Sequence, residues 1–562
     1  MKKALRFASA ALLAAAALGI AIPAFAQDGI STMESNSPNM TVSDDGLITY
    51  AAESCDYGGQ ILSITAVDAS TVQFQLCGPD GAFPQKVAFS SVGIQPLEHL
   101  VATGGGGEAL YRNPIGTGPY SLGQWNLGTE IVLNRFDGYW GDPAGEPTAI
   151  FRWLPEAASR LVELQAGTVD GIDNPGPGDF GVIAADPNLS LHERPGLNIF
   201  YLGLNRDIAP FDNLNVRLAI AHAIDKQRIV DNFYPPGSSV ANQFMPPDIF
   251  GWTEGFEDSA YDPELAQQLL AESGLELPLE VTLNYRDVVR GYLPTPGTVA
   301  QDIQAQLAPI GINVTIEVME SGTFLDASDA GELSLYLLGW GADYPDATNF
   351  MDVHFGRGAS AQFGEHYTEI EDLLIAAGQE SDPAVRLEQY AQVNALIRDN
   401  AITVPIAHGG SGVAYRAVIE GQNVSPLGNE SLAVLSDPDD DNIIFMQNGE
   451  PAGLYCADET DGEALRVCEQ ITEPLLGYEI GGTAVVPALA SEWSASEDGL
   501  TWTFNLREAQ FHDGSALDAN DVVISYAVQW DASNPLHVGR DGSFTYWTYL
   551  FAAFLNPPPA AE

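Results

Sequence analysis

Segments with the periodicity of strands alternate with segments with the periodicity of helices from Asn113 onward. The runs 130–136 (EIVLNRF) and 197–205 (LNIFYLGLN) read as strands. Residues 155–167 and 215–230 instead carry apolar side chains at the spacing of one helical face. Such interleaving predicts an α/β fold rather than an all-helical or all-strand one.

The length of the chain excludes a single hydrophobic core. Cores stop growing at roughly 250–300 residues, and this chain has 562. Its apolar content of 45% supplies enough buried surface for a globular fold and argues against disorder. We therefore expect at least two lobes.

The first 26 residues have the composition of a Sec-type signal peptide. Three basic residues precede an apolar run from Ala8 to Ile22, which is too short to span a bilayer. Small residues at Ala24 and Ala26 fit cleavage after Ala26. The sequence therefore predicts an exported protein, periplasmic or extracellular, without stable membrane insertion. Residues 27–54, rich in Ser, Asn, Asp and Gly, are predicted to be a flexible leader.

The charge balance excludes two classes of partner. The chain carries 76 acidic and 22 basic residues, a net charge of −54. Nucleic acids and anionic lipids are repelled by such a surface. Two interpretations stay open, namely selection for solubility in high salt and a merely acidic exported protein.

Four cysteines in an exported chain favour two disulfides, with free thiols as the alternative. Cys55 and Cys77 flank two alternating segments that read as a β-hairpin, so a bridge closing that hairpin is predicted. Cys456 and Cys468 form the second candidate pair. Their spacing matches no zinc motif, and metal binding and cofactors are not expected.

Four stretches carry a family resemblance, which covers most of 55–556. They are 485–528 (VVPALASEW to ISYAV), 113–141, 210–230 and 337–350 (LLGWGADYPDATNF). Each resembles a segment of the large solute-binding proteins of ABC importers, the dipeptide/oligopeptide/nickel-binding class (family 5). The resemblance implies a two-lobed periplasmic-binding-protein fold, type II-like, with an extra small domain in one lobe.

The order of the segments departs from that family. In the family, the segment matching 443–556 comes first and runs into the hairpin matching 61–77. A circular permutation explains this order if the original ends are joined near the polar stretch 437–442. The competing interpretation is a fusion or misassembly of two gene fragments, but no segment is duplicated.

The resemblance also implies domain boundaries. The small extra domain is expected at 55–108 plus 470–562, the first lobe at 109–212 plus 413–469, and the second lobe at 213–412. Within 485–528, Trp502, Phe504 and Leu506 alternate with polar residues as in a half-buried strand. Asp518 is predicted to be a helix N-cap, with Asp521 three residues later.

The candidate ligand residues come from the resemblance. Asp343 matches the position that holds the α-amine of a bound peptide, and a buried ammonium needs a charged acceptor. Trp340 would pack on the peptide, and Tyr344 is included as a further contact. Arg290 matches the position that clamps the peptide carboxylate, a task suited to a guanidinium fork.

Neighbouring residues receive structural interpretations. Asp346 is predicted to cap the following helix, and Arg286 is predicted to form an ion pair. The aromatic-rich run 542–554 is expected to be core, with one or two rings lining the cleft.

The predicted function is capture of a short peptide or similar zwitterion between the lobes of a monomer and delivery to an ABC permease. Nickel chelates, sugars and opines stay open as ligands. An enzyme is not expected, because no GxSxG, HExxH or phosphate-binding loop is present. The alternatives are a sensor or receptor module that uses the same cleft and a secreted hydrolase with an unrecognised carboxylate pair.

Overall fold

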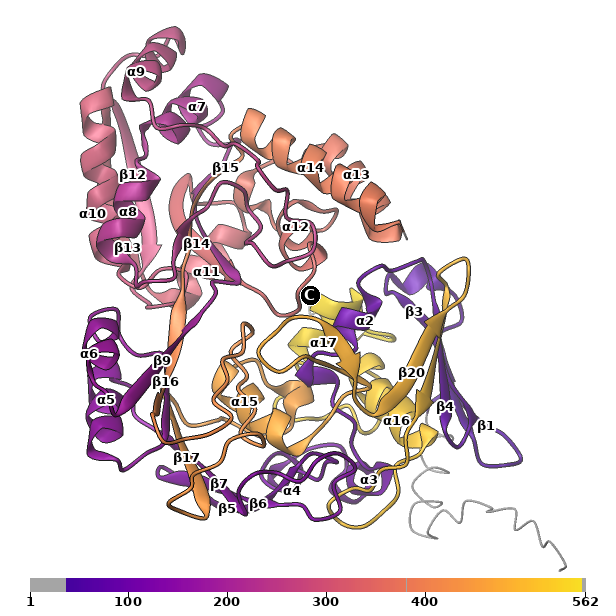
Figure 1. Cartoon of the computed structure of the whole chain (residues 1–562). Coiled ribbons are helices and arrows are strands. Elements are labelled where there is room, and N and C mark those ends of the chain that lie inside the picture. The colour runs from indigo at the N-terminus through magenta and orange to yellow at the C-terminus, as the bar shows by residue number, and fades with distance from the viewer. Residues whose placement is uncertain (1–36, 381, 558–562) are drawn as a thin grey trace, which may run out of the picture.

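The computed structural model describes residues 37–380 and 382–557, which form two lobes and a small domain attached to one of them (Figure 1). The predicted signal peptide lies outside these residues. Three large sheets, of six, six and seven strands, organise the three parts. The α/β class predicted from the sequence is confirmed.

The extra domain is built on a six-stranded sheet whose strands come from both ends of the chain. Its order is β1-β2-β3-β4-β21-β20. In Figure 1, indigo and yellow elements therefore lie side by side in this domain. The strands are β1 (Met40–Val42), β2 (Ile48–Ala51), β3 (Ile61–Asp68), β4 (Thr71–Leu76), β20 (Ala490–Ala495) and β21 (Thr501–Leu506).

The expectation of a flexible leader over 27–54 is wrong for its described second half. β1 pairs with β2 and β2 with β3, so residues 40–51 extend the sheet. Met40, Ile48 and Tyr50 are buried under it.

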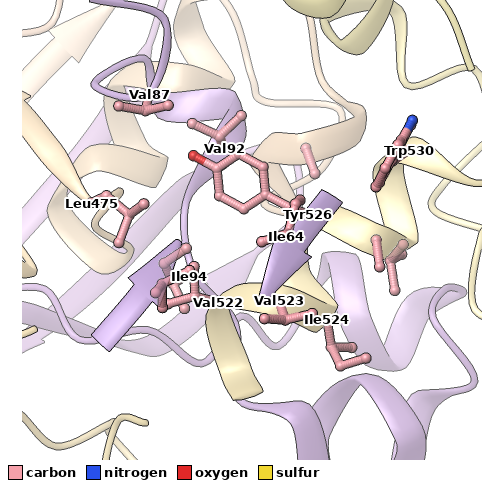
Figure 2. Close-up of a cluster of buried hydrophobic side chains, with 14 of the residues drawn as sticks. Ile64, Val87, Val92, Ile94, Leu475, Val522, Val523, Ile524, Tyr526 and Trp530 are labelled. Carbon is pink, nitrogen blue, oxygen red and sulfur yellow. The ribbon is translucent and has the colours of Figure 1, made fainter. Parts of the chain in front are cut away.

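Helix α16 (Ala519–Trp530) is the centre of the extra domain, and all of its residues are buried. Asp518 and Asp521 form a capping box at its start, which confirms the predicted cap. Figure 2 shows Val522, Tyr526 and Trp530 of this helix among aliphatic side chains that include Ile64 and Leu475. The shorter elements of this domain are α2 (Phe83–Lys86), α3 (Leu97–Thr103), α4 (Glu108–Tyr111), α17 (Thr545–Phe551), β18 (Leu476–Tyr478) and β19 (Val485–Pro487).

The first lobe contains the seven-stranded sheet β5-β6-β7-β17-β8-β16-β9. β17 lies between β7 and β8 and runs parallel to both. This strand begins where the polar stretch 437–442 ends, and it therefore occupies the centre of the sheet. The elements are β5 (Tyr120–Asn126), β6 (Glu130–Arg135), β7 (Thr148–Trp153), β8 (Gly171–Asp173), β9 (Leu189–Arg194), β16 (Ser411–Arg416), β17 (Asn442–Gln447), α5 (Ala157–Ala166), α6 (Phe180–Ala185) and α15 (Gly462–Ile471).

The second lobe contains the sheet β11-β15-β10-β14-β12-β13. The strands are β10 (Asn198–Leu204), β11 (Ser239–Val240), β12 (Leu279–Arg286), β13 (Ile312–Met319), β14 (Leu335–Gly341) and β15 (Thr403–His408). The helices are α7 (Leu214–Ala223), α8 (Lys226–Phe233), α9 (Pro263–Glu272), α10 (Pro296–Leu307), α11 (Ser321–Asp329), α12 (Thr348–Phe355), α13 (Thr368–Gln379) and α14 (Pro383–Asp399).

Two sequence predictions for this lobe need correction. β10 pairs with β14 and β15, so the second lobe begins before the predicted boundary at 212/213. The single helix predicted over 215–230 is two helices, because Asp225 accepts a bond from the backbone N–H of Arg228 and caps a second one.

Two chain crossings join the lobes, from β9 to β10 and from β15 to β16. They are fastened to each other by Asn198, whose Nδ2 donates to Gly409 O (2.7 Å) and whose Oδ1 accepts from Gly409 N (2.8 Å). A Cβ on Gly196 would lie 2.6 Å from Gly409 O, so the two backbones approach closely enough to require glycine. We refer to these two crossings as the hinge.

A buried network of four charges lies beside the hinge in the first lobe. Arg194 Nη2 lies 2.9 Å from Asp173 Oδ1 and 2.5 Å from Glu430 Oε1. Arg466 contacts the other oxygens of the same two carboxylates, at 2.8 and 3.0 Å. Burial alone would raise the pKa of Asp173, but Arg466 and Arg194 hold it below its usual value.

The two predicted disulfides are confirmed. Cys55 bonds to Cys77 and Cys456 bonds to Cys468, with Cα atoms 5.5 and 6.0 Å apart. Within the described part of the chain, no helix has the length and hydropathy required to cross a bilayer.

Removing Arg194 should destabilise the first lobe strongly. We expect Arg194→Met to lower the free energy of unfolding by about 3–5 kcal/mol, since it leaves two buried carboxylates with one cation between them. Urea denaturation measures this change. The control is Arg152→Met, which removes a partly exposed pair with Glu130 and should cost less than about 1 kcal/mol. Equal effects of the two substitutions would contradict the role of the network.

Candidate functional site

A cavity of about 1320 Å³ lies between the lobes. Its walls come from all three parts of the molecule. The extra domain contributes 59–60, 77–80, Lys86 and residues of 546–552, the first lobe contributes Arg194 and Ser411, and the second lobe contributes residues of β14, of α12 and of the loop after β12. Clefts between domains are common places for ligand binding in proteins. This cavity is the candidate site.

The segment 337–350 forms one edge of the cavity, as a strand followed by a loop and a helix. β14 is an apolar strand that pairs with β10 over its whole length. The loop after it is fixed by Asp346, which is fully buried. Its Oδ1 accepts from Thr348 N (3.0 Å), at the start of α12, and both of its oxygens accept from Arg386. The predicted capping role of Asp346 is met only in part, because the residue directly before α12 is Ala347, which makes no side-chain cap, and Asp346 bonds to Thr348 N from one position earlier. The ion pair with Arg386 was not foreseen.

Asp343 is half-buried on the cavity wall. Its Oδ2 accepts from Asn349 Nδ2 (2.9 Å), and Asn349 Oδ1 accepts from the Asp343 backbone N–H (2.9 Å). Its Oδ1 accepts from the hydroxyl of Tyr546 in the extra domain at 3.1 Å. No cation among the described residues lies within 4.0 Å of it. Burial raises the pKa of Asp343 to about 6, and the bonds from Asn349 and Tyr546 only partly oppose this.

Trp340 and Tyr344 are placed differently. Trp340 is half-buried on the cavity wall, edge-on to His354 and to Tyr549 with ring centroids 5.3 and 6.2 Å away. Tyr344 is only 2% exposed and packs into the core of the extra domain, with Lys86 over its ring. Trp340 thus offers an aromatic surface to the cavity, whereas Tyr344 mainly joins the lobes.

Arg290 and Arg286 line the cavity from the loop after β12 and from the end of that strand. Arg290 is exposed, and its only side-chain hydrogen bond among the described residues goes to Val289 O. Arg286 donates to Ser321 Oγ and to Tyr292 Oη, both at 3.0 Å. The ion pair predicted for Arg286 is wrong, because its partners in the described structure are hydroxyl groups.

Sequence reasoning missed Asp352 and the pair of Asp80 with Lys86. All three line the cavity, and Lys86 Nζ lies 2.8 Å from Asp80 Oδ2. Asp352 Oδ2 is buried without a hydrogen-bond partner in the described structure, and burial raises the pKa of Asp352 to about 7. The spacing of Thr348 and Asp352 on one helical face was the available signal. The expectation that one or two rings of 542–554 line the cleft is confirmed by Tyr546 and Tyr549.

Metal-binding geometry is not found in the part of the chain that the structure describes. There, no group of three or more His, Cys, Asp or Glu side chains is placed to hold a metal ion.

Comparison with a family model and with known proteins identifies the relatives of this chain. Residues 25–362 and 484–542 match the family described as "Bacterial extracellular solute-binding proteins, family 5 Middle". The dipeptide-binding protein of Escherichia coli K12 is 34% identical over 382 residues, which are 67% of this chain and 71% of that protein. Heme-binding protein A of Haemophilus influenzae is 29% identical over 377 residues, 66% of this chain and 69% of that protein.

Two solved structures extend the comparison. HbpA2 from Haemophilus parasuis aligns with a TM-score of 0.62 at 26% identity, covering 71% of this chain and 90% of that one. A periplasmic binding protein from Helicobacter pylori, in complex with the peptide STSA, aligns with a TM-score of 0.55 at 25% identity, covering 69% of this chain and 85% of that one. Both alignments support the two-lobed fold.

The environment of Asp343 indicates how the stability of the ligand-free protein depends on pH. Its folded-state pKa of about 6 exceeds the ordinary value of 3.8, so the folded state disfavours the charged form. Stability is therefore lost as the pH rises from about 4 to 6 and stays lower above that range. Asp343→Asn should raise the free energy of unfolding by about 1–2 kcal/mol at pH 7.5 and by nothing below pH 4.

Thermal unfolding at both pH values measures this effect. The exposed substitution Asp44→Asn, in the turn between β1 and β2, is the matched control and should change neither value. A lower melting temperature for Asp343→Asn at pH 7.5 would show that the charged carboxylate does not destabilise the folded state.

Proposed function

This chain belongs to family 5 of the bacterial extracellular solute-binding proteins, and we propose that it captures a short peptide between its lobes. The observation that carries the proposal is Asp343, a half-buried carboxylate on the cavity wall with hydrogen bonds but no cation beside it in the described structure. A peptide α-ammonium supplies the missing positive charge and up to three donors. The relatives named for dipeptide binding support this choice of ligand.

The opposite end of the peptide is assigned to Arg290. Its guanidinium lines the same cavity and has no carboxylate partner in the described structure. A planar fork of donors suits a terminal carboxylate. Asp343 and Arg290 together select a short zwitterion, and Trp340 covers an apolar part of it.

Capture and delivery follow from the hinge. The lobes are joined by two crossings held together at Asn198 and Gly409, and rotation there opens or closes the cavity. Closure changes the outer surface that both lobes present together, which an ABC permease reads as the loaded state. This role requires export, directed by the signal peptide ending at Ala26, and requires no covalent chemistry.

Calorimetric titration with peptides of two to five residues tests the proposal. We expect stoichiometric binding that Asp343→Ala weakens by about 1.5–3 kcal/mol. Affinity should also fall as the pH drops below about 6, because protonated Asp343 no longer attracts an ammonium.

The control is Glu492→Ala, an exposed residue of β20 that does not line the cavity, which should leave the affinity unchanged. Hemin is titrated in parallel, because one relative is named for heme binding. Tight hemin binding without peptide binding would overturn the peptide assignment.

We also propose that the segment order is a circular permutation of the family order. The ends of the described chain lie together, since Asn556 Nδ2 donates to Asn39 Oδ1 (2.9 Å) and Gln60 N donates to Phe551 O (3.1 Å). A covalent link between them therefore needs little rearrangement. The family matches the chain in two separate blocks, which also fits this order.

A chain in the restored order tests the permutation. It starts at Asn442, passes from Asn556 through a short Gly-Ser linker to Ser37, and ends at Asp441. We expect its melting temperature and peptide affinity to match those of the present chain, because every sheet keeps its strands. A control chain opened inside β10 should not fold. Failure of the restored chain to fold would favour two joined fragments over a permutation.

A further inference from the structure

Most basic side chains among the described residues of this acidic protein are paired with carboxylates. Both described lysines and most described arginines have a carboxylate oxygen within 4.0 Å. The exceptions are Arg160, Arg217, Arg507, Arg286 and Arg290. Because the chain carries 76 acidic residues, an arginine without a carboxylate partner needs an explanation.

Three of the exceptions have other partners away from the cavity. Arg160 donates to four backbone carbonyls, including those of Leu154 and Asn174. Arg217 donates to the carbonyls of Phe211 and Asn400. Arg507 lies 3.5 Å from the ring centroid of Trp140. These three are structural.

The two that remain, Arg286 and Arg290, both line the cavity. They lie four residues apart, at the end of β12 and in the loop that follows. Gly291, beside Arg290, contacts the hinge, because a Cβ on Gly409 would lie 2.1 Å from Gly291 O. The cavity wall formed by the end of β12 and the following loop therefore carries two guanidinium groups that have no carboxylate oxygen within 4.0 Å among the described residues.

The guanidinium of Arg286 is held in place by neutral hydrogen-bond partners. Its two terminal nitrogens donate to Ser321 Oγ and Tyr292 Oη, neutral partners that fix the guanidinium without cancelling its charge. Tyr292 in turn lies against β14 at Gly339, where a Cβ would lie 2.4 Å from its ring. A guanidinium has five N–H donors, so donors stay available for a ligand.

We propose that Arg286 is a specificity-determining residue that binds an acidic side chain on the carboxyl-terminal residue of the peptide, next to the terminal carboxylate on Arg290. The preferred ligands are then short peptides ending in Asp or Glu. This inference rests on the proposed function and adds the class of peptide to it.

Matched peptides test it by calorimetry, with Ala-Glu against Ala-Gln and Ala-Ala-Glu against Ala-Ala-Gln. In each pair the acidic peptide should bind roughly tenfold or more tightly, as a charge-assisted bond replaces a neutral one. Arg286→Gln should abolish this preference, and Arg286→Lys should retain part of it because the charge stays.

Arg135→Gln is the control for the change in net charge, since Arg135 lies on β6 and pairs with Asp137. It should keep the full preference. Equal affinity for the two peptides of each pair, or a preference that survives in a folded Arg286→Gln protein, overturns the inference while leaving peptide capture intact. Binding of none of the four peptides overturns the proposed function as well.

Discussion

The buried network of Arg194, Asp173, Glu430 and Arg466 fixes how the segments of the first lobe are arranged beside the cavity, which Arg194 itself lines. Its members come from β9, β8, a loop and α15, segments that are far apart in the chain. Taking four charges out of water is costly, and only their mutual contacts and further hydrogen bonds offset that cost. Arg194 is also the last residue of β9, so the network fixes the direction in which the chain enters the hinge.

The periodicity of the sequence was enough to predict the class of the fold and many of its elements. β6, β10, α5 and the cap of α16 lie where the alternation of apolar residues and the Asp518 motif placed them. β1 and β2 were missed because strands of three and four residues carry too few positions to show a period. Their stability comes from pairing with β3, a contact that local sequence does not reveal.

The site was predictable mainly where position in the family supplied the answer, and the aromatic-rich run 542–554 added the rings of Tyr546 and Tyr549. Asp343 and Trp340 lie on the cavity wall as that position implied, whereas Tyr344 is mainly core. Arg286 has no sequence signature as a cavity residue, because its significance lies in the absence of a carboxylate beside it in the described structure. An arginine without a carboxylate partner is recognisable only after every neighbouring strand, helix and loop has been placed.

The pairing of β4 with β21 constrains the order in which this protein acquires its structure. Gln75 and Thr501 contact each other across 426 residues, so the extra domain stays incomplete until almost the whole chain is available. The second lobe needs only the continuous stretch from β10 to β15 and is free to fold earlier. Tyr546, which covers Asp343, belongs to the part that arrives last. The candidate site therefore lacks its Tyr546 contact until α17 has packed against the rest of the described chain, so early folding of the second lobe does not by itself complete the cavity.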